Sequence, residues 1–134
     1  MAATPKLVLL ILAVRDLPGM TAFYVRVLGW SQVVEVPVYA ELQSPEGLRI
    51  GLYAEAGFGR NIGVVPEASP PITRTELYLH CEDLHATIER AVAAGARQLS
   101  PIGPRDWGDE AAYFADPEGN VVVLARPLAS HGQS

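Results

Sequence analysis

Three polar side chains alternate along one short run of the sequence, at Glu76, Tyr78 and His80. Leucines stand between them, and such alternation is typical of a β-strand with one polar and one apolar face. A carboxyl, a phenol and an imidazole on one face can bind a small organic molecule, or can exchange protons with one. Because Glu76 and His80 would stand roughly 13 Å apart on a strand, those two side chains cannot chelate one metal ion.

Three further residues carry groups that often contact ligands. Trp107, in the stretch PRDWGDE, lies in a predicted loop before a strand, where its ring can stack on a flat molecule. Arg49 and Tyr53 share one face of another predicted strand. Structural roles are the alternative for the candidate residues. Trp107 can be a packing residue at the edge of the binding site, and Glu76 can form an ion pair with Arg49 or Arg74.

The elements that position these residues follow one pattern used twice. An extended run, an Asp-Leu step, a helical stretch, a glycine and further extended runs occur in residues 6–54 and again in residues 74–128. Each half therefore reads βαβββ, with its first strand beginning near Leu7 or Thr75.

The limits of the two predicted helices are marked by particular residues. Asp16 and Asp83 stand where a carboxylate caps free helix amides, and Gly29 and Gly95 stand where a helix ends in a left-handed residue. Residues 55–73 are rich in glycine and proline, so we expect a connecting loop there rather than a helix or a strand.

Length and composition predict one folded domain over residues 1–134. The chain is 49% apolar and 19% charged, as globular domains are. Its 15 acidic and 10 basic residues give a net charge of -5, which argues against a nucleic-acid partner. The longest apolar run, Leu7 to Val14, is too short to cross a membrane. With a single cysteine, Cys81, and no signal peptide, we expect a cytoplasmic protein.

Two stretches, VRDLPGMTAFYVRVLGW and RDWGDEAAYFADPEGN, resemble the signature regions of the vicinal oxygen chelate (VOC) superfamily. That superfamily includes glyoxalase I, bleomycin-resistance proteins and extradiol dioxygenases. The resemblance spans residues 6–128. It implies an α+β fold in which two βαβββ modules form a curved, incompletely closed barrel around a cup. It also implies a homodimer, because small members commonly pair.

In metal-dependent members the resemblance implies four ligands, and the corresponding positions here are Leu9, Gly51, Glu76 and Val123. Leucine, glycine and valine side chains have no donor atom for a metal ion. We therefore expect no metal site and no cofactor, with Leu9, Gly51 and Val123 bounding the cup instead. The turn DPEGN before Val123 would be kept because it builds the fold.

Two classes of function remain open. The first is a metal-free small-molecule-binding protein of the glyoxalase/bleomycin-resistance type, which would sequester an antibiotic or another toxic compound. The alternative is a lyase, isomerase or dioxygenase of the same superfamily acting on a small organic substrate. Such an enzyme would use Glu76, Tyr78 or His80 as acid or base without a metal ion, or would need metal ligands outside the family pattern. No catalytic residue is assigned. The residues expected to contact the ligand are Glu76, Tyr78, Trp107, Arg49, Tyr53, His80, Leu9, Gly51 and Val123.

Overall fold

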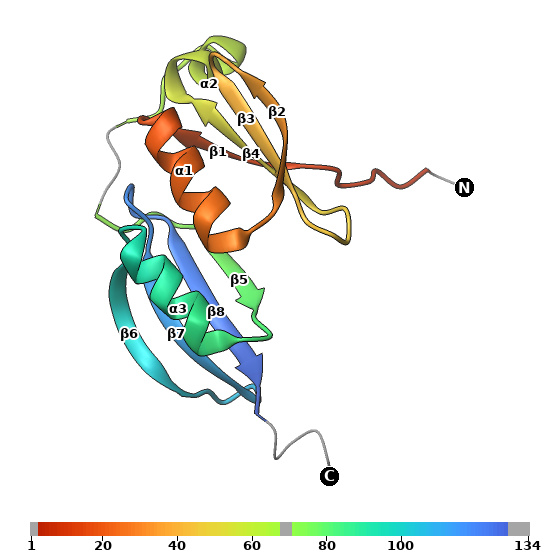
Figure 1. Ribbon diagram of the computed structural model, residues 1–134. Coiled ribbons are helices and arrows are strands. Elements are labelled where there is room, and N and C mark those ends of the chain that lie inside the picture. The colour runs from red at the N-terminus through yellow and green to blue at the C-terminus, as the bar shows by residue number, and fades with distance from the viewer. Residues whose placement is uncertain (1–2, 68–70, 129–134) are drawn as a thin grey trace. The chain divides into compact units, whose positions relative to one another are not determined.

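The computed structural model describes residues 3–67 and 71–128, which fall into two compact units, Met1–Glu67 and Ala68–Ser134. Each unit contains a mixed sheet of four strands with a long helix against one of its faces (Figure 1). The predicted α+β class and the two βαβββ modules are confirmed. Over residues 3–67 and 71–128 the strands form two separate four-stranded sheets and no closed barrel.

The first unit has strand order β1-β4-β3-β2, with β1 parallel to β4 and the other neighbours antiparallel. Its elements are β1 (Leu10–Val14), α1 (Leu17–Leu28), β2 (Ser31–Val36), β3 (Tyr39–Gln43), β4 (Arg49–Ala54) and α2 (Glu55–Ile62).

The second unit repeats this arrangement with strand order β5-β8-β7-β6, and β5 is parallel to β8. Its elements are β5 (Glu76–His80), α3 (Leu84–Ala93), β6 (Arg97–Pro104), β7 (Asp109–Ala115) and β8 (Val121–Pro127).

The predicted helix limits are confirmed in both units. The carboxylate of Asp16 accepts a hydrogen bond from the backbone amide of Gly19 at 3.0 Å, and Asp83 accepts one from Ala86 at 3.1 Å. Gly29, after α1, has a φ of 68°, a conformation that glycine adopts without steric cost. On α1 the apolar stripe faces the sheet, and the buried side chains are Leu17, Met20, Phe23, Tyr24 and Val27.

A Pro-Glu-Gly turn joins the last two strands of each unit. Gly47 and Gly119 occupy equivalent places, with φ of 93° and 92°. In the second unit the buried carboxylate of Asp116 accepts hydrogen bonds from the amides of Glu118 and Asn120 and from the Asn120 side chain, at 2.8 to 3.0 Å. The DPEGN stretch thus has a structural role of its own, without any metal ligand at Val123.

One predicted loop is wrong: α2, Glu55–Ile62, occupies the first part of the 55–73 segment. Its glycines and its lack of a side-chain N-cap argue against a helix, yet tertiary packing overrides that weak propensity. Phe58 meets the Tyr53 ring edge-on at 6.3 Å, and Gly57 lies so close to the same ring that a Cβ there would be 2.7 Å from it.

The first strand also begins later than predicted, at Leu10 rather than near Leu7, which is 82% exposed. The cause is the length of its parallel partner. Since Leu10 is level with Ile50 and β4 begins at Arg49, residues before Leu9 have no part of β4 beside them.

Within the described residues, no helix is both long enough and apolar enough to cross a membrane.

Candidate functional site

The polar face of β5 is the face turned away from α3. Glu76, Tyr78 and His80 are exposed on it, while Leu77 and Leu79 are half-buried on the other side. The neighbouring strand β8 places Val123 beside Tyr78 and Ala125 beside His80. The alternation read from the sequence is therefore confirmed.

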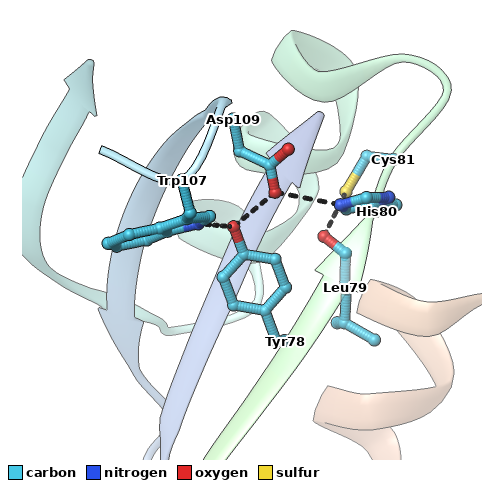
Figure 2. A network of polar contacts seen from close by, with 6 residues as sticks. All are labelled: Tyr78, Leu79, His80, Cys81, Trp107 and Asp109. Carbon is cyan, nitrogen blue, oxygen red and sulfur yellow. Dashed lines mark hydrogen bonds and ion pairs between the residues drawn. The ribbon is translucent and has the colours of Figure 1, made fainter. Parts of the chain in front are cut away.

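A continuous chain of hydrogen bonds links four side chains over this face (Figure 2). The indole N–H of Trp107 donates to the Tyr78 hydroxyl at 2.7 Å, and that hydroxyl donates to Oδ2 of Asp109 at 2.6 Å. Nε2 of His80 lies 3.0 Å from the same carboxylate oxygen. Residues from a strand, a loop and a second strand thus form one cluster, which we call the Asp109 cluster: Tyr78, His80, Trp107 and Asp109.

Hydrogen bonding and burial set the protonation states of two members of this cluster, Asp109 and Tyr78. The hydrogen bond from Tyr78, and then that from His80, hold the pKa of the Asp109 carboxyl below its usual value. Burial, and then the hydrogen bond to Asp109, raise the pKa of Tyr78. Asp109 is therefore the anion at neutral pH, and Tyr78 keeps its proton.

Asp109 is the member of the cluster that the sequence did not reveal. It is 9% exposed and begins β7, and Tyr78 and His80 reach it across the intervening strand β8. Two small side chains, Ala125 and Ala111, lie next to each other in that part of the sheet. No local pattern marks Asp109, because its partners are about thirty positions away in the sequence.

The loop that carries Trp107 is fixed by Arg105. The Arg105 guanidinium donates to the carbonyl oxygens of Pro101 at 3.0 Å and Ala111 at 2.8 Å, and lies 4.9 Å from the centre of the Tyr113 ring. The Arg105 amide also donates to the Asp109 carbonyl at 2.7 Å. Trp107, which is 58% exposed, is therefore held by its loop and by its bond to Tyr78 rather than by burial.

The first unit carries its own polar group on the corresponding sheet face. Glu41 on β3 is 5% exposed, and its carboxylate accepts from the Tyr39 hydroxyl at 2.7 Å and from the Arg49 guanidinium at 2.8 Å. Arg49 makes its ion pair with Glu41. Glu41 was missed, although the alternation Tyr39-Ala40-Glu41-Leu42-Gln43 is a signal that could have indicated it.

Tyr39 also fills the space above Gly51. A Cβ built on Gly51 would lie 2.3 Å from the Tyr39 hydroxyl oxygen. Burial, and then the hydrogen bond to Glu41, raise the pKa of Tyr39, so the phenol stays neutral. The space beside Gly51 on this face of the sheet is therefore occupied by the Tyr39 side chain.

We expect Gly51→Ala to lower the free energy of unfolding by about 1 to 3 kcal/mol, since the added methyl group must displace Tyr39 from Glu41. In a Tyr39→Ala background the same substitution should cost clearly less, because the obstructing ring is gone. Urea unfolding of the two single variants and the double variant measures the coupling. Equal costs of Gly51→Ala in both backgrounds would show that Tyr39 does not constrain position 51.

Tyr53 belongs to an aromatic row on the first sheet. Its ring meets that of Tyr39 edge-on at 5.5 Å, and its hydroxyl accepts a hydrogen bond from Asn61 of α2 at 3.1 Å. Arg49, Gly51 and Tyr53 thus share one face of β4, as predicted, with Glu41 beside Gly51.

The remaining predicted residues lie outside these two groups. Within the described second unit, no hydrogen bond or ion pair joins Glu76 to the Asp109 cluster. Leu9 precedes β1 and is half-buried. Val123 is fully buried with Ala111 and Ala125, and the partly buried Tyr113 and Val121 pack against this group.

The side chains present do not fit the family-type metal ion. Of the four positions implied for ligands, only Glu76 has a donor atom, and the space at Gly51 holds the Tyr39 ring. Among residues 3–67 and 71–128, no three His, Cys, Asp or Glu side chains are grouped so that they could bind one ion.

Comparison with known proteins gives a consistent result. Residues 9–125 match the family model described as a glyoxalase-like domain. A biphenyl-2,3-diol 1,2-dioxygenase from Rhodococcus globerulus is 29% identical over 127 residues, which are 92% of this chain and 64% of that protein. The chain thus spans less than two thirds of that relative.

Solved structures show the same fold. A glyoxalase-related enzyme from Fulvimarina pelagi has a TM-score of 0.80 at 24% identity, covering 92% of this chain and 88% of the other. A glyoxalase/bleomycin resistance protein/dioxygenase from Nocardioides has a TM-score of 0.78 at 22% identity, covering 96% and 87%.

Proposed function

Because the chain belongs to the glyoxalase-like family, we propose that it binds a small planar organic molecule and needs no metal ion to do so. The observation that carries this proposal is the Asp109 cluster, with Trp107 as its exposed aromatic member. A ring held in place by hydrogen bonds offers a flat apolar surface at little entropic cost, which suits stacking on a ligand.

The charge of the site favours a ligand with a basic group. Asp109, at the start of β7, is an anion. Glu76 adds a second carboxylate, on the face of β5 that carries Tyr78 and His80. The Arg105 guanidinium nearby is engaged with backbone carbonyls and with the Tyr113 ring. A cationic aromatic molecule would therefore meet an attractive field. Sequestration of a toxic compound of this kind, as in bleomycin resistance, is the role that we infer.

The dioxygenase alternative has less support. Extradiol-type iron chemistry uses two histidines and a carboxylate on one metal ion. The positions implied for such ligands here are leucine, glycine, glutamate and valine, and the dioxygenase relative is only 29% identical. Binding without metal agrees better with these side chains.

Trp107→Ala should weaken binding of a planar cationic dye such as acriflavine by about 5- to 150-fold, equivalent to 1 to 3 kcal/mol, through loss of stacking and burial. Titration calorimetry measures the dissociation constant, and dialysis against EDTA should leave it unchanged. Trp30→Ala is the matched control, because Trp30 lies in the first unit, between α1 and β2. Equal affinity in the wild type and Trp107→Ala, with the dye bound at one site, would contradict the proposal.

A further inference from the structure

We propose that His80 is a general base that takes a proton at Nδ1 from a molecule bound on the Asp109 cluster, with Asp109 as its positioning residue. This inference rests on the proposed function, because the same face must first bind the molecule. It goes beyond that function, because it assigns a reaction class: proton abstraction from a planar carbon acid without a metal ion.

The hydrogen bond to Asp109 selects the tautomer of His80. Asp109 is ionised, so its Oδ2 can only accept. Nε2 of a neutral His80, 3.0 Å away, must therefore carry the ring proton, which leaves the lone pair on Nδ1. In Ser-His-Asp hydrolases a buried carboxylate orients the catalytic imidazole through Nδ1–H and leaves Nε2 as the base, so the two ring nitrogens exchange roles in His80.

Nδ1 is free to meet a substrate. The His80 side chain is 56% exposed, and Figure 2 shows the second ring nitrogen on the side away from Asp109. Within residues 71–128, no side chain or backbone group is hydrogen-bonded to Nδ1. The Tyr78 ring lies 5.9 Å from the imidazole, and its hydroxyl is hydrogen-bonded to Trp107. A flat molecule bound against the rings of Tyr78 and Trp107 would therefore lie close to the base.

Asp109 is the charged group in contact with His80. On its own strand the polar neighbour of His80 is Tyr78, whose ring centre lies 5.9 Å away, and β8 contributes the uncharged Ala125 beside His80. The hydrogen bond to the Asp109 carboxylate therefore orients the imidazole so that Nδ1 is presented to a bound molecule.

A defined probe for this chemistry is 5-nitrobenzisoxazole, a planar aromatic carbon acid. The base removes the proton from the ring carbon C3, the electron pair of that C–H bond forms the nitrile, and the N–O bond breaks. The product is 2-cyano-4-nitrophenolate, whose absorbance reports the rate. No oxidant or reductant takes part, and the imidazolium returns its proton to water.

We expect the protein to turn over this probe with saturation kinetics and faster than free imidazole at equal concentration. His80→Gln keeps an N–H for Asp109 but has no base, so kcat should fall at least about tenfold with KM little changed. His85→Gln is the matched control, because His85 is exposed on α3 and should have no effect.

The split between kcat and KM separates a positioning role of Asp109 from a purely structural one. Asp109→Asn keeps the size of the side chain but removes the anion that selects the Nε2–H tautomer of His80, so kcat should fall at least about tenfold with KM little changed. Unchanged kcat in Asp109→Asn would overturn the role of Asp109, and equal kcat in His80→Gln and the wild type would overturn that of His80.

Quenching of tryptophan fluorescence by the probe in the same samples distinguishes binding of the probe from proton abstraction by His80. Saturable quenching without turnover would overturn the base and leave the binding function intact. Absence of both saturable quenching and saturable turnover would count against the binding site and the base together.

Discussion

Asp116→Ala should lower the free energy of unfolding by about 3 to 4 kcal/mol, because three donors lose one charged acceptor in a buried turn. Two of these are backbone amides, of Glu118 and Asn120. The third is the Asn120 side chain, whose oxygen in turn accepts from the hydroxyls of Thr73 and Thr75 before β5. Urea unfolding at neutral pH measures the change.

Asp83→Ala provides the control for Asp116→Ala. It also removes an aspartate that accepts from a backbone amide, but at the exposed N-terminus of α3, where water replaces the lost bond. We expect a cost of about 1 kcal/mol there. A cost for Asp116→Ala no larger than that of Asp83→Ala would mean that the DPEGN turn does not stabilise the second unit in the way described.

Glu41→Ala should lower the free energy of unfolding by about 2 to 3 kcal/mol, below the full cost of breaking a buried ion pair. The carboxylate is 7% exposed, but its partner Arg49 is 37% exposed and can partly recover its hydration. Tyr39 also loses the acceptor of its hydroxyl. Thermal or urea unfolding measures the difference from the wild type.

The second unit offers a matched pair for this test. Glu110 and Arg126 form an ion pair across two neighbouring strands, and the Glu110 side chain is 24% exposed. Glu110→Ala should cost about 1 kcal/mol or less, as is usual for ion pairs near the surface. If Glu41→Ala and Glu110→Ala lower the free energy of unfolding equally, the burial of Glu41 does not strengthen its ion pair with Arg49.

Local patterns predicted the elements of this chain well because their causes are local. The Asp16 and Asp83 caps and the Pro-Glu-Gly turns act within a few residues. The short helix α2 was missed because it depends on a ring in β4, Tyr53, that packs on its glycine-rich turn. Such packing is a property of the folded chain rather than of the local sequence.

The site could be predicted only in part for the same reason. Alternation in β5 placed Tyr78 and His80 on one face, and the loop position of Trp107 was read correctly. Asp109 could not be found, because its role depends on the strand order β5-β8-β7, which brings it to its partners. Val123 was expected at the cup from the family resemblance, and the second unit places it in a buried group.

Tyr39 and Gly51 constrain each other's replacement over evolutionary time. A carboxylate side chain introduced at position 51 would collide with the Tyr39 hydroxyl and could not reach a metal ion. If Tyr39 is lost first, Glu41 is left with one partner fewer and the sheet with a gap. Either order passes through a less stable protein, and selection removes variants that fall below the stability needed for function. Once this pair is in place, a lineage carrying it is held away from metal binding at position 51 even where metal chemistry would be useful.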